Sequence, residues 1–369
     1  MSEMAEKSKS TSPVHTLILY PRPHADTLLS TFLLRTYATQ AFPGVETAKV
    51  DFWTSGKDGK NGQDWLKEGF LLVDMGGGPL DHHGTNACAS QLISEYLGIA
   101  KLPELEKLLT WVNRDEKEGK GTTSKDAVDR ALGLSGMIMS LHRLHLDNPQ
   151  KVLDAVFPLF EAHIAQEKRR LYEVPNEWAE AQKTGKAKTL TMKHGKSDVT
   201  VVRIESTSMD LVGFLRNSRD VHADIVVQLM PSKHINIVSN QKSDIRLEET
   251  VRILRIEEAR KKKIDTTQFT PEQLGSGGRL ALLPEWFYDK AANTVQNGGV
   301  IPGSVAATQL SAEEVTNALL VGLNEALLEK LCPPQEGCRG AQCYFFDFAL
   351  KRCLPRKLQQ IKTDSESRA

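Results

Sequence analysis

The stretch FLLVDMGGGPLDHHG, residues 70–84, joins a short apolar run to a cluster of ionisable side chains. The apolar residues 70–73 stop at Asp74 and three consecutive glycines, which predicts a buried strand that ends in a turn. Seven residues after Asp74 come Asp81, His82 and His83, one carboxylate and two imidazoles of the kind that bind Mn²⁺, Mg²⁺ or Zn²⁺. An isolated Asp-His-His is more often a plain polar turn, so a metal site needs support from other segments.

A second pair of candidate ligands lies near the start of the chain. Residues 14–20, VHTLILY, are rich in strand-forming residues and are followed by Pro21, so we expect a strand to end there. His24 and Asp26 come next and precede a stretch with apolar residues at helical spacing. The loop at the carboxyl end of a strand is where an open α/β sheet usually binds its ligand. Alone, an H-x-D at this place is more often a helix cap beside an uninvolved histidine.

The segments after the Asp-His-His add one more carboxylate. Thr85 or Asn86 can cap a predicted helix over 87–97, whose N-terminus would favour an anion such as phosphate. Asp115 follows a predicted helix that begins near residue 105. It is either a further carboxylate of the metal site or, as is more common, part of a solvated helix end.

The second half of the chain has a different pattern. Long helices over 151–178 and a linker at 181–188 precede a ββαββα succession, which predicts a separate α+β domain that ends with a capped helix over 311–331. Glycine-rich loops at 275–279 and 297–299 have backbone N–H groups that could hold phosphate. The candidate substrate-binding residues in the second loop are Asn297, Gly298 and Gly299.

Other histidines and the cysteines give weaker signals. His142 and His145 lie three residues apart on a predicted helix without acidic partners upstream, which favours an ordinary helix face. Four cysteines near the C-terminus could bind Zn²⁺ or an iron–sulfur cluster, or could be free or oxidisable thiols, since no CxxC pair is present. They are Cys332, Cys338, Cys343 and Cys353.

Composition limits the classes of function. The 369 residues include 47 basic and 47 acidic side chains, so no strong overall field gathers nucleic acid or a membrane surface, and any anion binding must be local. No apolar run approaches the ~20 residues that span a bilayer, and the first 13 residues are polar. The cysteines do not form a disulfide framework spread over the chain. We therefore expect a soluble, cytoplasmic protein with a short disordered start.

The candidate ligands come from three or four separate predicted loops, and the first three of these loops lie at the strand-to-helix end of an α/β sheet, which suits an ion-dependent active site. This arrangement resembles the DHH phosphoesterase superfamily, whose motifs are an H-x-D after the first strand, an Asp after a later strand, Asp-His-His and a final Asp. The segment 73–77 followed by Asp81, His82 and His83 is most similar to the branch named for the melanocyte proliferating gene, whose members resemble metal-dependent exonucleases. The motifs cover about the first 130 residues.

The resemblance implies roles for the motif residues. His24, Asp26 and Asp74 would hold one Mn²⁺ or Mg²⁺ ion. Asp74, His82 and Asp115 would surround a second. His83 would face the phosphate as acid or electrostatic stabiliser, and Asp81 would orient the histidines.

The chain departs from the superfamily pattern at three places. Many DHH enzymes carry H-x-D-x-D, but residue 28 is Leu, which removes one ligand of the second ion. The melanocyte branch tends to follow its H-x-D with an acid, and this residue is Thr27. The glycine–glycine–histidine of the associated C-terminal domain is missing, and residues 297–300 are the nearest substitute.

The expected fold is α/β, with a parallel-sheet DHH-like domain, a smaller α+β substrate-binding domain and a cysteine-containing tail. The expected function is metal-dependent hydrolysis of phosphodiester bonds in short or single-stranded nucleic acid or small nucleotides. The alternative is a catalytically weakened nucleotide- or nucleic-acid-binding protein with one retained ion and a zinc or cluster site in the tail. The expected segments are a start at 1–13, a catalytic domain at 14–180, the linker at 181–188, a substrate-binding domain at 189–331 and a basic tail at 332–369.

Overall fold

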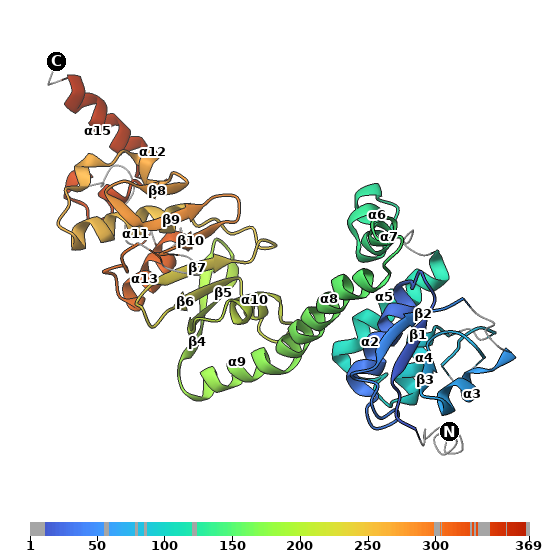
Figure 1. Ribbon diagram of the computed structural model, residues 1–369. Helices are drawn as coiled ribbons and strands as arrows, with labels where there is room; N and C mark the ends of the chain where they lie inside the picture. Colours follow the sequence, from blue (N-terminus) through green and yellow to red (C-terminus); the bar gives the residue numbers. More distant parts are fainter. Residues whose placement is uncertain are drawn as a thin grey trace. The chain divides into compact units, whose positions relative to one another are not determined.

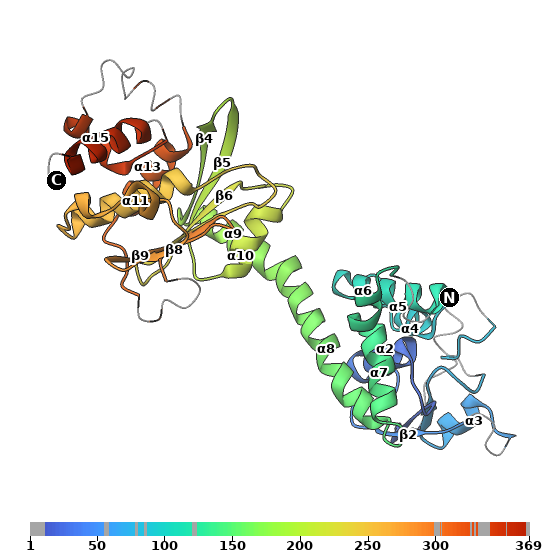
Figure 2. The same ribbon diagram turned by 90° about the horizontal axis from the view of Figure 1, so that it is seen from above.

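The computed structural model divides into two compact units, residues 1–171 and 172–369 (Figures 1 and 2). The structure describes residues 12–54, 59–77, 80–84, 87–119, 124–298, 303, 305–324, 327, 330, 340–351 and 353–366. Most of the predicted start, 1–13, lies outside these ranges. The two units are described separately below.

The first unit is built on a three-stranded parallel sheet with strand order β2-β1-β3. The strands are β1 (Thr16–Leu19), β2 (Lys49–Phe52) and β3 (Phe70–Leu72). Ile18 pairs with Leu72 in the parallel register, and the Val73 N–H donates to the Ile18 carbonyl, so β1 and β3 end side by side. The parallel sheet expected from the sequence is therefore present.

Side chains of the central strand alternate between two apolar clusters. Leu17 and Leu19 face a large cluster made with the helices, whereas Ile18 packs with Trp65 and Met75 on the opposite face. Both faces of the sheet are thus covered, as parallel sheets require. The helical elements of this unit are α2 (Ala25–Tyr37), α3 (Gly62–Lys67), α4 (Ala89–Tyr96), η2 (Pro103–Leu105), α5 (Glu106–Glu118), α6 (Ala127–Leu132), α7 (Leu134–Leu144) and α8 (Gln150–Lys168).

The second unit contains a seven-stranded mixed sheet, in which β5 and β6 are parallel and every other neighbouring pair for which a register is described is antiparallel. The strands are β4 (Ala187–His194), β5 (Ser197–Glu205), β6 (Ile225–Leu229), β7 (Ile235–Ser239), β8 (Gly278–Leu280), β9 (Leu283–Asp289) and β10 (Thr294–Gln296), in the order β4-β5-β6-β7-β10-β9-β8. The strands predicted between residues 189 and 238 are found, with shifted ends.

Helices cover both faces of this sheet (Figure 2). On one face α11 (Glu248–Lys261) and α13 (Ala312–Leu323) share a cluster with Val201 and Ile237, and on the other α9 (Val174–Lys183) and α10 (Met209–Asn217) pack on Val202 and Val238. The remaining helical elements are η3 (Arg169–Glu173), η4 (Thr266–Gln268), α12 (Pro271–Leu274), η6 (Gly340–Gln342), η7 (Phe346–Phe348) and α15 (Leu354–Glu366).

Several segments differ from the sequence-based expectation. Residues 181–188 are the end of α9 and the start of β4, and the boundary between the units lies earlier, next to residue 171. The second unit is not the smaller one, because it begins at residue 172 and includes the segment that was predicted as a separate tail. The pattern of the sequence did not predict the strands β8, β9 and β10, and β8 and β10 have three residues each and lie next to glycines. No helix in the described ranges is long and apolar enough to cross a membrane.

Candidate metal centre

The parallel register of β1 and β3 sets the position of the candidate site. Because both strands end at the same edge, the residues that follow them meet there. His24 is the residue before α2, and Asp74 is the second residue after β3. His24 Nε2 lies 3.5 Å from Asp74 Oδ2, so the H-x-D segment and the Asp that follows the third strand come together as expected from the sequence.

Asp74 is held in an unusual conformation. Its side chain is 1% exposed, and its backbone has a φ of 61°, in the left-handed region that residues other than glycine seldom adopt. The Thr27 hydroxyl donates to Oδ2 at 3.1 Å, and His82 Nδ1 hydrogen-bonds to Oδ1. Burial and the negative charge of Asp26 raise the pKa of Asp74, against the opposing effect of His82 and His24. A bound cation would relieve this unfavourable burial of negative charge.

Asp81 organises the turn that carries the two histidines. Its carboxylate accepts the N–H of Gly77 at 2.7 Å and the N–H of His83 at 3.0 Å. Burial alone would raise the pKa of Asp81, but these N–H donors and the His83 ring lower it below its ordinary value. The turn requires Gly76, which has a φ of 84° and whose Cβ, if present, would lie 2.6 Å from a methyl carbon of Leu72.

The Asp81 carboxylate also orients the ring of His83. Its Nδ1 lies 2.6 Å from Asp81 Oδ1, which leaves Nε2 for a ligand, and this hydrogen bond raises the pKa of His83. The His83 ring stacks on that of His82 with centroids 4.8 Å apart. The hydrogen bond between Asp81 and the His83 ring is the contact that Asp81 needs if it orients the histidine, as the resemblance implies.

Asp74, His82 and His83 form a group that could hold a metal ion. Each contributes one ligand atom, and the three atoms lie within 4.8 Å of one another. Asp74 is buried, His82 is partly exposed and His83 is exposed, so the group opens to solvent on one side. A carboxylate oxygen with two imidazole nitrogens suits Mn²⁺ and Zn²⁺, while Mg²⁺ prefers oxygen ligands. The group therefore fits a divalent cation, without selecting one.

Asp26 has a structural task that the sequence did not reveal. The side chain is fully buried, and its two oxygens accept the N–H groups of Ala89 and Ser90 at 2.6 and 2.8 Å. These are the first two residues of α4, whose own N-cap residue, Cys88, makes no side-chain cap. The helix predicted over 87–97 therefore begins at residue 89 and takes its cap from α2. Asp26 Oδ2 also lies 3.9 Å from His82 Nδ1, at the margin of the metal group.

Replacing Asp26 by Ala is expected to lower the free energy of unfolding by about 2 kcal/mol, because two buried N–H groups lose their acceptor. Urea unfolding of the full chain measures the change. Asn61→Ala is the matched control, since the Asn61 side chain caps α3 at an exposed position and its loss should cost less. Equal losses in the two variants would argue against a buried capping role for Asp26.

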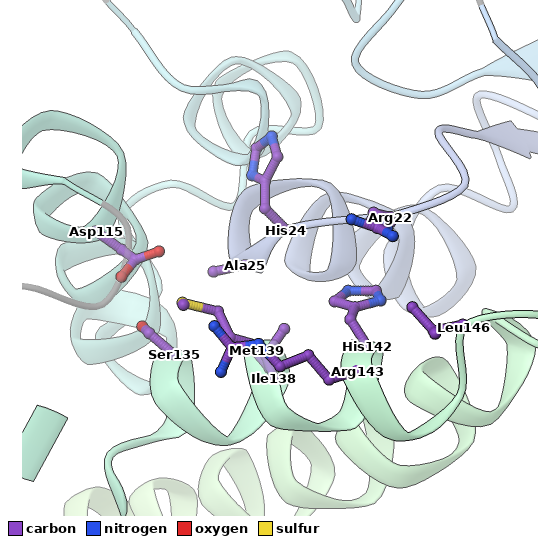
Figure 3. A pocket seen from close by; sticks show the side chains of 10 residues that line it. All are labelled: Arg22, His24, Ala25, Asp115, Ser135, Ile138, Met139, His142, Arg143 and Leu146. Atoms are coloured by element: carbon purple, nitrogen blue, oxygen red, sulfur yellow. The ribbon is translucent and has the colours of Figure 1, made fainter. Parts of the chain in front are cut away.

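His24 and Asp115 lie at the border of a cavity next to this group (Figure 3). His24 Nδ1 is 3.6 Å from Glu116 Oε2, a carboxylate that the motif search did not identify. Asp115 is 4% exposed, on the last turn of α5, and is not a member of the three-residue metal group. The expected assembly of all five ligands around two ions thus remains a prediction. The compact group contains two of the five, Asp74 and His82, together with His83, for which the resemblance implied a place facing the phosphate.

Thr27 was also missed as a functional candidate. In the sequence, Thr27 stands out only because the melanocyte branch tends to have an acidic residue at this position. In the structure its hydroxyl donates to Asp74 and lies 3.4 Å from His24 Nε2. Leu28, at the other departure, is fully buried among apolar residues.

The residues that were predicted to bind substrate in the second half of the chain are Asn297, Gly298 and Gly299. Asn297 is fully buried, and its side chain donates to the carbonyls of Glu285 and Ala306 and accepts the N–H of Thr308, so it is occupied in holding the fold. Gly298 follows it with a φ of 85°, and Gly299 lies outside the described residues.

The tail cysteines are described only in part. Cys343 and Cys353 form no disulfide, Cys353 is buried, and neither belongs to a metal-binding group within the described ranges. Cys332 and Cys338 lie outside those ranges, so the zinc or iron–sulfur site remains a prediction.

Comparison with known proteins gives no family assignment. The sequence matches no protein-family model, and a search of curated proteins returns no match. The functional argument therefore depends on the geometry of the site.

Proposed function

We propose that this protein is a metal-dependent phosphoesterase that acts on phosphodiester bonds of short nucleic acids or small nucleotides. The observation that carries the proposal is the Asp74, His82 and His83 group at the carboxyl end of a parallel sheet. Its support is the match between this group and the motifs by which the chain resembles DHH phosphoesterases.

In this proposal Asp74, His82 and His83 hold a divalent cation, Mn²⁺ or Mg²⁺. When bound, such an ion lowers the pKa of a coordinated water and stabilises the charge that develops on a phosphoryl group. Thr27 fixes the Asp74 carboxylate through its hydroxyl, and Asp81 keeps the His83 ring in place through Nδ1. Because these hydrogen bonds already fix the side chains, the site needs little reorganisation when the substrate binds. Such preorganisation is the main source of electrostatic catalysis.

His24 is the candidate for proton transfer next to the ion. It lies between Asp74 and Glu116, with one ring nitrogen near each carboxylate, and it is 30% exposed toward the cavity. A histidine oriented by carboxylates can accept a proton from water or donate one to a leaving oxygen.

A single-ion, catalytically weakened binding protein is the second candidate. The capping bonds of Asp26 and the burial of Leu28 favour it, because both reduce the number of carboxylates free for a second ion. Binding of nucleotide without turnover would select this candidate.

Hydrolysis with and without metal tests the proposal. Purified protein should cleave a 5′-phosphorylated diadenylate with Mn²⁺, lose this activity after treatment with a chelator and recover it when Mn²⁺ is returned. A positive result needs one further check, namely that the Asp74→Asn protein, purified in parallel, is inactive. Absence of cleavage with Mn²⁺, Mg²⁺ and Zn²⁺ alike would contradict the proposal.

A further inference from the structure

The consecutive helices α6 and α7 of the first unit carry the most exposed large apolar side chains in the described part of the chain (Figure 1). Val128 and Leu132 on α6 are 63% and 69% exposed, and Leu144 on α7 is 74% exposed. A single exposed apolar side chain is ordinary, but a concentration of them on neighbouring elements marks a place of contact with another molecule. Only Gly133 separates the two helices, and we call residues 127–144 the α6–α7 pair.

The helix α6 has its apolar side toward solvent. All six of its residues are exposed. At about 100° per residue, Asp129 and Arg130 lie on one side of the helix, where they border a cavity that α5 and α8 also line. A surface helix of a globular protein normally turns its apolar stripe toward the core. The orientation of α6 is therefore that of a helix that buries its apolar side against another molecule. That side consists of Ala127, Val128, Ala131 and Leu132.

Local contacts fix α6 in this orientation. The Asp126 carboxylate caps the helix by accepting two N–H groups of its first turn. The Arg130 guanidinium donates to the carbonyls of Ser124 and Lys125 at 3.2 and 2.8 Å. A Cβ at Gly136 would lie 2.0 Å from the Arg130 carbonyl oxygen, so the start of α7 touches the end of α6. A rotation that buried the apolar side would break these contacts, and the exposure is thus a property of the fold.

The helix α7 adds an exposed apolar stripe of its own. Met137 and Leu144 are seven residues apart, which places them on the same side of the helix, and both are exposed. Ser140 lies between them and donates its hydroxyl to the Gly136 carbonyl, so its hydrogen is already used within the helix. Ile138, on the other side of α7, is buried in the core of the unit. The stripe therefore needs an apolar partner and no polar one.

The charges around these stripes limit the kind of partner. Residues 124–147 contain three basic and three acidic side chains. A nucleic acid or an anionic lipid surface requires an excess of basic charge, which this segment lacks. A neutral surface that carries both signs can pair with itself, because two-fold symmetry places the same patch on both sides of the interface. The charged residues are Lys125, Arg130 and Arg143 with Asp126, Asp129 and Asp147.

We infer that the α6–α7 pair is the contact surface of a symmetric dimer, in which the pair of one copy covers the pair of a second copy of this chain. The inference goes beyond the proposed function and does not depend on it. Four large apolar side chains per copy make a small interface, so the dimer dissociation constant is expected to be on the order of 10 µM.

Sedimentation equilibrium of the full chain tests the inference. Between about 1 and 300 µM, the wild type should pass from monomer to dimer. The double variant Val128→Ser, Leu132→Ser should raise the dissociation constant by about a hundredfold or more, because each dimer loses four apolar side chains. Circular dichroism and the thermal midpoint of the dilute variant should equal those of the wild type, since both side chains are exposed in the single chain.

Leu282→Ser is the matched control, because Leu282 is also an exposed leucine but lies between β8 and β9 of the second unit. This variant should dimerise as the wild type does. Hydrogen exchange of the wild type should slow within residues 127–144 when the protein is concentrated, which places the contact on the α6–α7 pair.

A wild type that stays monomeric over the whole range, or a dimer that persists in the folded double variant, would overturn the inference. Slower exchange only outside residues 127–144 would also overturn it. Sedimentation needs neither metal nor nucleotide, so these outcomes are independent of the hydrolysis test. Cleavage by a monomer contradicts the dimer alone, and a dimer without cleavage contradicts the phosphoesterase alone.

Discussion

Asp74→Asn is expected to lower turnover by about a thousandfold and to abolish tight binding of Mn²⁺, while the first unit stays folded. Asparagine has the size of aspartate and tolerates the left-handed backbone that Asp74 adopts. Its amide oxygen can still accept the hydrogen bond of Thr27. The variant therefore removes little besides the negative charge, which is the property that an ion needs in this buried place.

The comparison needs a variant with the same chemical change elsewhere in the unit. Asp51→Asn serves, because Asp51 is exposed on β2 and, among the described residues, its side chain bonds only to its near neighbours Phe52 and Trp53. Turnover and Mn²⁺ affinity are measured on both variants, with circular dichroism as the test of folding. A folded Asp74→Asn protein that binds and turns over as the wild type does would remove Asp74 from the proposed centre.

Arg255→Met is expected to destabilise the second unit by about 3 kcal/mol or more. Arg255 is a fully buried cation on α11 whose guanidinium donates to five backbone carbonyls. These belong to Gln273, Leu274, Ser276, Gly278 and Trp286. Burial lowers the pKa of Arg255 to about 10, which still leaves the group charged at neutral pH. Methionine fills much of the same volume but leaves all five carbonyls without this donor.

Hydrogen exchange followed by mass spectrometry can localise the loss to peptides of α11 and β9. Arg260→Met is the control on the same helix, because Arg260 is 27% exposed and its partners can turn to water. We expect that variant to cost about 1 kcal/mol or less. A similar small effect for both arginines would mean that the buried carbonyl network contributes little to stability.

The sequence allowed much of the first unit to be predicted. The apolar runs before His24 and before Asp74 are strong strand signals, and the chemistry-bearing residues follow them directly. Since parallel strands end at one edge, the proximity of His24 and Asp74 was predictable without coordinates.

The role of Asp26 was not predictable, because its partners lie more than 60 residues away on α4. Capping rules consider residues next to a helix end, and a cap supplied by another helix has no local pattern. The same reason explains His142, whose ring nitrogen hydrogen-bonds to the carbonyl of Pro23 only because α7 packs against the segment before α2. In the second unit Asn297 followed a glycine-rich pattern, but burial and three hydrogen-bond partners give it a structural role.

A crystal of the full chain soaked in Mn²⁺ and measured for anomalous scattering tests the metal centre most directly. The account predicts a Mn²⁺ peak about 2.0 to 2.3 Å from an oxygen of Asp74 and from one nitrogen each of His82 and His83. A fully soaked crystal with no peak among these three side chains, or with Mn²⁺ bound only elsewhere, would contradict it.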